Sequence, residues 1–287
     1  MNKPLIGWVG LGNMGNAMVL NLLKNDFTVH VYNRTKEKES EVVNAGALSQ
    51  DSLQQLVHNS SIIFTMVSDD NAVKEIFESS EGLLSHSPSG KVFVDMSTVS
   101  PTTSKHLAEI CANSRNEFLE APVSGSVKPA AEGTLVIIAG GPQETFDKVK
   151  PVFDVLGKKT FLVGENGAGT SAKLGINYFL AATLQALSEM VVFTKQKGID
   201  PKDILDILNE GALSSAFTKM KAANILNDDY KAAFQLQHLV KDLRLAGDVG
   251  LDMPLYAPLF ETFLEAMESG LGEQDCMAVI KHIEENQ

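Results

Sequence analysis

Short apolar runs alternate with helix-like stretches over the first half of the chain. The runs lie at 5–10, 28–32, 61–67, 91–96, 117–123, 135–140 and 159–164. Buried parallel strands read as short apolar runs, and the crossovers between them are usually helical. The alternation therefore predicts a doubly wound α/β domain with a mainly parallel sheet, helices on both faces and right-handed crossovers.

The strand pattern stops after Gly164. The stretch 168–198 is helical in length and apolar nearly all round, which is typical of a helix buried against several neighbours or a second subunit. Shorter helices are expected at 201–210, 217–226, 234–249, 255–269 and 274–285. We therefore predict an α/β domain over 1–164, an all-α domain over 165–287, and a homo-oligomer, either a dimer or a tetramer.

Composition excludes several classes of function. The 287 residues, 44% of them hydrophobic and 21% charged, suit a globular protein with two cores. The net charge of −12 argues against a nucleic-acid partner. Polar breaks in every long apolar run and an N-terminus without a cleavage site predict a cytoplasmic protein without a membrane span. Cys111 and Cys276 are expected to be free thiols, and no Cys/His spacing predicts a metal.

A glycine-rich turn follows the first apolar run. Gly10, Gly12 and Gly15 form the pattern G-x-G-x-x-G between a predicted strand and a predicted helix at 13–25. The first glycine permits a tight turn, the second lets a pyrophosphate approach the backbone, and the third allows close helix–strand contact. An ordinary tight turn is the alternative, but the setting favours a dinucleotide site, which the intervening residues would also line: Leu11, Asn13 and Met14.

The second strand ends in Asn33, Arg34 and Thr35 instead of the acid that accepts a hydrogen bond from the adenosine ribose in many such sites. A carboxylate there would repel a 2′-phosphate. Asn33 can donate a hydrogen bond to that phosphate, and the planar Arg34 guanidinium can pair with it and stack on adenine. Thr35 adds a hydroxyl, and Lys36 or Lys38 can add charge. The segment therefore predicts NADP(H) in preference to NAD(H), with a solvated arginine as the alternative.

Later motifs make a family resemblance specific. They occur in the order "GLGNMG" (10–15), "DMSTVSP" (95–101), "EAPVSGS" (120–126), "GAGTSAKLGIN" (167–177) and "FQLQHLVKDLRLA" (234–246). Together they resemble the β-hydroxyacid dehydrogenase family, which includes the 3-hydroxyisobutyrate dehydrogenases, and look most like its glyoxylate/succinic semialdehyde reductase branch. The resemblance implies an N-terminal Rossmann domain, an all-helical C-terminal domain and reduction of a short aldehyde acid by NADPH.

Lys173 and Asn177 lie one turn apart on the same face of the long apolar helix. An unpaired buried ammonium group is expensive, so Lys173 requires a reason to be there. It could reach solvent or pair with a carboxylate. Alternatively, it protonates a substrate carbonyl oxygen, a task that desolvation and nearby cations suit by lowering a lysine pKa. The resemblance favours this catalytic role, with Asn177 hydrogen bonded to the lysine or to the substrate.

Ser124, Gly125 and Ser126 follow a strand and offer two hydroxyls and backbone amides that can hold a carboxylate; a plain turn is the alternative. The family suggests that these three residues bind the substrate acid. Further assignments follow the resemblance, with Phe234 and Lys241 at the substrate, and Lys241 also at the cofactor. The remaining cofactor positions are Val67, Ser68, Thr98 and Asp242. Without the family, an exposed Lys–Asp pair would be the default interpretation of Lys241 and Asp242. His238 is expected to be a surface or packing residue.

The sequence therefore predicts reduction of glyoxylate or succinic semialdehyde by NADPH, with Lys173 as general acid. One alternative is an NADP-dependent dehydrogenase of 3-hydroxyisobutyrate or a related β-hydroxyacid. Another is a non-catalytic, NADP-bound scaffold or sensor, against which the lysine argues. A phosphogluconate-type decarboxylating enzyme is disfavoured, because the chain lacks a larger helical extension.

Overall fold

The computed structural model describes residues 3–85 and 87–287. The chain forms two compact units, one ending at Lys173 and the other comprising Leu174–Gln287. The division falls inside the long helix α8 (Ala168–Gln196), whereas the sequence places the boundary just before this helix. The first turns of α8 therefore belong to the α/β unit, and the remainder belongs to the helical unit.

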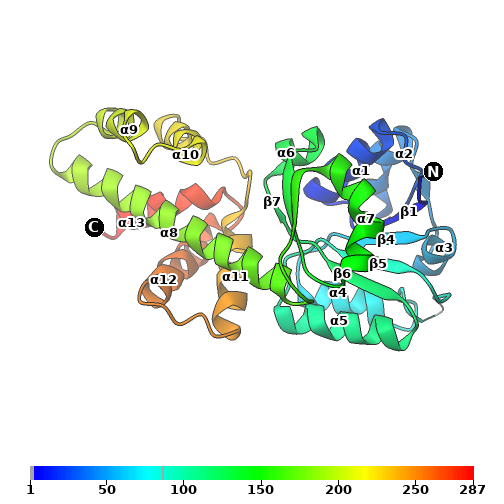
Figure 1. Cartoon of the computed structure of the whole chain (residues 1–287). Helices are drawn as coiled ribbons and strands as arrows, with labels where there is room; N and C mark the ends of the chain where they lie inside the picture. The colour runs from blue at the N-terminus through cyan, green and yellow to red at the C-terminus, as the bar shows by residue number, and fades with distance from the viewer. Residues whose placement is uncertain (1–2, 86) are drawn as a thin grey trace. The chain divides into compact units, whose positions relative to one another are not determined.

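The α/β unit is built on a six-stranded parallel sheet with the order β3-β2-β1-β4-β5-β6 (Figure 1). Its strands are β1 (Ile6–Val9), β2 (Val29–Tyr32), β3 (Leu48–Ser49), β4 (Ile62–Thr65), β5 (Val92–Asp95) and β6 (Glu117–Glu120). All except β3 coincide with an apolar run. The doubly wound prediction is confirmed, and this strand order brings the carboxyl ends of β1 and β4 together where nucleotides bind in such sheets.

The helices of this unit differ in whether a side chain caps their first turn. They are α1 (Asn13–Lys24), α2 (Ser40–Asn44), α3 (Leu53–His58), α4 (Asp70–Glu78), α5 (Pro101–Asn113), α6 (Val127–Glu132) and α7 (Gln143–Leu156), with a 3₁₀ turn at Lys36–Glu39. Side-chain oxygens of Ser52, Asp69 and Ser100 accept hydrogen bonds from amides in the first turns of α3, α4 and α5. By contrast, α1 begins at Gly12, which has no side chain to cap it.

The expectation of one sheet is wrong for the last strands of the unit. β7 (Val123–Ser124), β8 (Leu135–Ala139) and β9 (Gly157–Leu162) form a separate sheet, in which β7 is antiparallel to β8 and β8 is parallel to β9. The run at 117–123 is divided because Pro122 has no N–H to donate to a ladder. Its carbonyl instead accepts from Ile138, so the chain turns away from the main sheet after β6.

The second unit is entirely helical. The remainder of α8 is accompanied by α9 (Pro201–Glu210), α10 (Ala216–Leu226), α11 (Leu236–Asp248), α12 (Tyr256–Ala266) and α13 (Val279–Glu285). All five shorter helices were expected, although a π turn at Met267–Leu271 continues α12 and a 3₁₀ turn at Cys276–Ala278 precedes α13. Helix α8 is long and apolar enough to cross a membrane by length and composition, which a core helix also can be.

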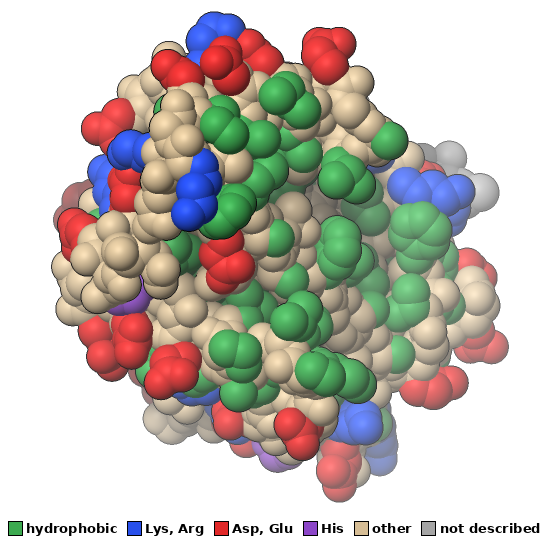
Figure 2. Space-filling model, turned by 90° about the vertical axis from the view of Figure 1, so that its left-hand side faces the viewer, with side chains coloured by type: hydrophobic (Ala, Val, Ile, Leu, Met, Phe, Trp, Pro, Cys, Tyr) green, Lys and Arg blue, Asp and Glu red, His purple; other side chains and the backbone are tan. Residues whose placement is uncertain are grey.

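The helical unit leaves many large hydrophobic side chains in contact with solvent. Figure 2 shows hydrophobic side chains gathered over the middle of the face that it displays. The most exposed in this unit are Phe179, Phe193, Ile207, Leu213 and Leu255. Contiguous apolar surface on a globular protein usually marks a contact with another molecule.

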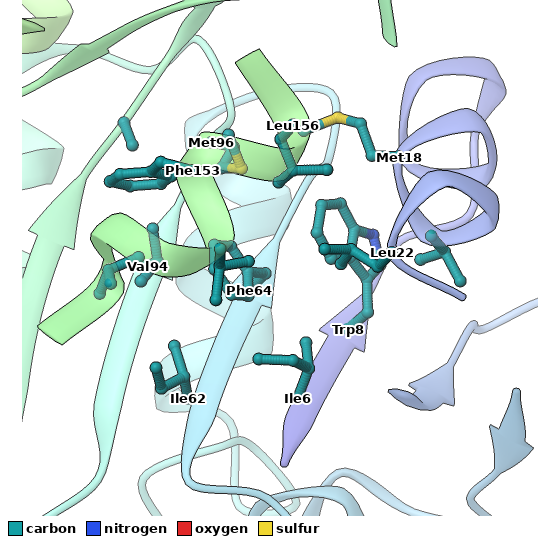
Figure 3. Close-up of a cluster of buried hydrophobic side chains, with 14 of the residues drawn as sticks. Ile6, Trp8, Met18, Leu22, Ile62, Phe64, Val94, Met96, Phe153 and Leu156 are labelled. Atoms are coloured by element: carbon teal, nitrogen blue, oxygen red, sulfur yellow. The ribbon is translucent and has the colours of Figure 1, made fainter. Parts of the chain in front are cut away.

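The core of the α/β unit fixes the start of α1 (Figure 3). Trp8 on β1 stacks on Phe64 of β4, with ring centroids 5.3 Å apart, and Phe153 of α7 meets Phe64 edge to face. Met18 and Leu22 of α1 are buried in the same cluster. In addition, the Trp8 indole Nε1 donates a hydrogen bond to the carbonyl oxygen of Gly10 at 3.0 Å. The strand and the glycine turn are thus held together by one side chain.

Candidate active site

The three motif glycines meet different surroundings. A Cβ on Gly10 (φ 97°) would lie 2.2 Å from the Met66 carbonyl oxygen, and one on Gly15 would lie 2.1 Å from the Gly10 carbonyl oxygen. A Cβ on Gly12 would meet nothing within 4 Å. The protein itself therefore requires Gly10 and Gly15, whereas Gly12 borders open space at the amino end of α1. The first amides of a helix lack intrahelical partners, so this turn fits a bound pyrophosphate.

The contrast between Gly12 and Gly15 can be tested with two alanine substitutions. Gly12→Ala should leave the melting temperature nearly unchanged but weaken NADPH binding, because its methyl group would occupy the space for phosphate. Gly15→Ala should cost about 1–3 kcal/mol or more of folding stability, because its methyl group meets backbone. Thermal unfolding and NADPH titration measure the two effects. Equal destabilisation by both substitutions would contradict the assignment.

The loop after β2 is fastened to the glycine turn. The Asn33 side chain accepts a hydrogen bond from the Leu11 amide at 2.9 Å and donates one to the Thr35 carbonyl at 2.8 Å. Its own amide donates to the buried Glu39 carboxylate at 2.8 Å. Asn33 thus connects the glycine turn to the loop after β2, the two segments predicted to bind the cofactor. The sequence did not reveal this role.

The cations of this loop differ in availability. The Lys36 ammonium is 3.0 Å from Glu39 and 2.5 Å from the Gln50 carbonyl, so internal partners occupy it. Arg34 is exposed and forms no ion pair within the described residues 3–85 and 87–287. Arg34 is therefore the better candidate for a 2′-phosphate.

Two neighbouring strand ends share a buried hydrogen-bond network. The Thr65 and Ser97 hydroxyls both donate to Asp95 Oδ1 at 2.7 Å, and Ser97 Oγ accepts from the Val67 amide at 3.0 Å. Burial raises the pKa of Asp95 above its usual value. The network fixes the backbone of Val67. Thr98, which is half-buried, follows Ser97 in the loop after β5. Sequence reasoning missed Asp95, although an acid at the end of the apolar run "VFVD" was a signal.

The segment assigned to the substrate acid has an unusual backbone. Ser124 ends β7, and Gly125 has a φ of 139°, at which a side chain is strained; a Cβ would also lie 2.7 Å from Leu135 Cδ2. Ser126 precedes α6, yet its side chain does not cap that helix. Both serines are half-buried, and Gly125 is exposed.

Glu120 is a second buried acid that the sequence reasoning missed. It ends β6, is 0% exposed, and accepts hydrogen bonds from the amides of Gly167, Gly169 and Thr170 at 2.8, 2.6 and 3.1 Å. The Ser104 hydroxyl on α5 also donates to it. Burial raises the pKa of Glu120 to about 7, and Asp95 adds to the rise, while the amide hydrogen bonds oppose it.

This pKa predicts how stability changes with pH. The folded-state pKa of about 7 exceeds the ordinary value of 4.5, so the folded protein keeps a proton that the unfolded chain has released. Stability from this group is therefore greatest below about pH 4.5 and is lost as pH rises through about 7. Between about pH 5 and pH 8, the wild type should lose about 2–3 kcal/mol more than Glu120→Gln, which cannot titrate. Urea unfolding measures the difference, and parallel curves would contradict it.

Lys173 follows these amides on α8. Lys173 lies one turn beyond Gly169 and is only 9% exposed. The lysine is therefore held in a segment whose first turn is bound to Glu120.

Three predicted residues of the helical unit are joined. The Asn177 side-chain amide donates to the Asp242 carboxylate at 2.5 Å, and the Lys241 ammonium lies 2.9 Å from the same carboxylate. Asp242 is only 2% exposed. In addition to its predicted place at the cofactor, it therefore holds Asn177 and Lys241 together inside the protein.

Phe234, which the sequence assigns to the substrate, stacks with His238 at a centroid distance of 6.5 Å. Burial, followed by the nearby Lys241, lowers the pKa of His238.

Comparisons with known proteins show the family of the chain. Residues 5–164 match the NAD binding domain of 6-phosphogluconate dehydrogenase, and residues 167–283 match the NAD-binding region of NADP-dependent 3-hydroxyisobutyrate dehydrogenase. Glyoxylate/succinic semialdehyde reductase 1 of Arabidopsis thaliana is 38% identical over 97% of this chain and 98% of its own. For 2-(hydroxymethyl)glutarate dehydrogenase of Eubacterium barkeri, the identity is 33%, over 98% and 95%.

Among solved structures, Psf3 in complex with NADP+ and 2-OPP superimposes with a TM-score of 0.90 at 26% identity, over 97% of this chain and 100% of Psf3. The matched regions cover both units and the whole set of motifs. The chain therefore belongs to the β-hydroxyacid dehydrogenase family, related to 3-hydroxyisobutyrate dehydrogenase, and is a nicotinamide-dependent oxidoreductase that acts on a CH–OH group or the corresponding carbonyl.

Proposed function

We propose that this protein reduces a short aldehyde acid with NADPH, converting glyoxylate to glycolate or succinic semialdehyde to 4-hydroxybutyrate. The observation that carries the proposal is the buried Lys173 on α8, in a chain 38% identical to a reductase named for these two substrates. A cytoplasmic location is part of the proposal.

The proposed cofactor contacts come from segments already linked to each other. The open space at Gly12 and the amides that begin α1 would hold the pyrophosphate. Arg34 and Thr35, both exposed, would bind the 2′-phosphate, while Val67, Ser68 and Thr98 would line the remaining path. When bound, NADPH supplies a hydride.

The protein's own groups would hold the substrate and move the proton. Ser124, Gly125 and Ser126 would bind the carboxylate, because two hydroxyls and backbone amides are donors suited to an anion. Lys173 would donate a proton from Nζ to the carbonyl oxygen and regain one from solvent. Asn177 would orient the reacting groups, and Phe234 and Lys241 would contact the substrate.

A substrate panel tests the proposal. Oxidation of NADPH and of NADH would be followed with glyoxylate and succinic semialdehyde, and reduction of NADP+ with 3-hydroxyisobutyrate and 2-(hydroxymethyl)glutarate. The proposal expects the highest kcat/KM for an aldehyde acid with NADPH. A higher value for a β-hydroxyacid would favour the dehydrogenase alternative, which the Eubacterium barkeri relative supports. Turnover of none of them would favour a scaffold or sensor.

We also propose that the protein is a homo-oligomer, a dimer or a tetramer. The proposal is supported by the exposed hydrophobic side chains of the helical unit, including Phe179, Phe193 and Ile207. Light scattering of the purified chain distinguishes a monomer from either assembly.

A further inference from the structure

The buried Glu120 carboxylate is surrounded by a cradle of backbone. Its Oε1 atom accepts hydrogen bonds from the Gly169 and Thr170 amides at 2.6 and 3.1 Å, and its Oε2 atom accepts from the Gly167 amide at 2.8 Å. These amides stand at the start of α8, where no carbonyl of the helix itself can bind them. One carboxylate therefore binds three of the amides at the beginning of the helix, while the Ala168 amide donates to the Glu165 carbonyl.

Glycine at two positions leaves room for this carboxylate. A Cβ on Gly140 would lie 2.4 Å from Glu120 Oε1, and a Cβ on Gly169 would lie 3.0 Å from the same atom and 2.6 Å from the Ile138 carbonyl oxygen. Glu120 also pairs with Gly140 through backbone hydrogen bonds in both directions, at 2.9 and 3.1 Å. The acid is thus fixed from the side of β8 as well as from the side of α8.

Glu120 connects the two segments that carry the groups needed for the proposed chemistry. Lys173 is four residues after Gly169 and three after Thr170, so its Cα lies about 5 Å further along the same helix. Ser124 is four residues after Glu120 on the segment that leaves β6. The carboxylate therefore joins the strand that leads to the substrate-acid segment to the helix that carries the proton donor.

We infer that Glu120 is a positioning residue. It fixes the axial position and the rotation of the first turns of α8, and thereby orients the Lys173 ammonium group. This inference rests on the proposed role of Lys173 as proton donor. Removing the carboxylate leaves three buried amides without their acceptor, and the first turn must shift or admit water to satisfy them. Displacement of a catalytic group by about 1 Å can reduce turnover by about 100-fold.

A purely structural role would give a different kinetic result. If Glu120 only stabilised the fold, its loss would reduce the fraction of folded enzyme while each folded molecule kept its turnover. If it aims Lys173, each folded molecule loses turnover while NADPH affinity stays the same, because the glycine turn and Arg34 do not contact Glu120. Turnover is therefore expressed per NADPH-binding site, counted by fluorescence titration.

The experiment compares Glu120→Ala, Glu120→Gln and the control Glu117→Gln, alone and combined with Lys173→Ala. Glu117 is an acid on the same strand whose partners, Thr145 and Lys148, lie on α7 and not on α8. We expect Glu120→Ala to lower kcat per site by about 100-fold with an unchanged Kd for NADPH. Glu120→Gln, which keeps one acceptor oxygen, should lose less, and Glu117→Gln should lose less than about twofold.

The double variant gives the decisive result. In the Lys173→Ala background, measured in single turnovers, Glu120→Ala should cause no further loss beyond about twofold, because the group that it aims is absent. A further loss of about 100-fold there would overturn the inference and leave the proposed function intact. Near-normal turnover of Lys173→Ala alone would instead overturn the proposed function. If Glu120→Ala does not fold, Glu120→Gln gives the same comparison.

Discussion

Replacing Lys173 with alanine is expected to reduce kcat by about 100- to 10,000-fold, the usual contribution of a general acid. The residue is 9% exposed, so alanine would leave a buried space at this position, and water there would be a weaker and less well-oriented proton donor. The Kd for NADPH, measured by fluorescence titration, should change by less than about threefold, since the proposed phosphate contacts come from Gly12 and Arg34. Steady-state and single-turnover kinetics measure kcat.

Two further variants test whether turnover depends on proton donation by Lys173 or only on its positive charge. Lys173→Arg keeps the positive charge but holds its proton too firmly to donate it, so turnover should remain low. Lys195→Ala removes a lysine from the same helix whose ammonium is exposed and paired with Glu284, so turnover should stay near that of the wild type. High activity in Lys173→Arg would mean that charge suffices and that proton donation is not the role.

Replacing Arg34 with alanine is expected to raise the KM for NADPH by about 10- to 100-fold while leaving the KM for NADH nearly constant. The range corresponds to the loss of a charge-assisted, two-point contact worth about 1.5–3 kcal/mol. The side chain is exposed, so its removal should not affect folding. Parallel kinetics with the two reduced cofactors measure the ratio of kcat/KM values.

Nearby substitutions separate geometry from charge at this site. Arg34→Lys retains the charge but not the planar fork, so it should recover only part of the preference for NADPH. Lys38→Ala removes an exposed lysine from the same loop and should alter the preference by less than about threefold. Equal changes for NADPH and NADH in Arg34→Ala would remove Arg34 from 2′-phosphate recognition.

The sequence predicts regular elements well where one physical signal dominates. Apolar runs locate β1, β2, β4, β5 and β6, because the main sheet buries those strands on both faces. The helices from α8 to α13 are found from length, periodicity and breakers such as Gly198 and Pro201. The two-residue strand β3 escapes notice because both its residues are exposed and carry no apolar pattern.

Tertiary contacts account for what the sequence does not reveal. An apolar run at 117–123 does not show that β7 leaves the main sheet, because that depends on which strand supplies the next hydrogen bonds. Glu120 is the first residue of the motif "EAPVSGS" but acquires its role from amides about fifty residues away in the chain. Likewise, Lys36 resembles a phosphate ligand in sequence, whereas folding brings Glu39 and the Gln50 carbonyl to it.

The hydrogen bond from the indole of Trp8 to Gly10 has a practical consequence. Trp8 is the only tryptophan among the 287 residues, so the ultraviolet emission of this chain comes chiefly from a single, fully buried ring. That ring is attached to the turn proposed to receive the coenzyme. The protein thus carries a built-in optical reporter, whose spectrum would register occupancy of the turn without any added label.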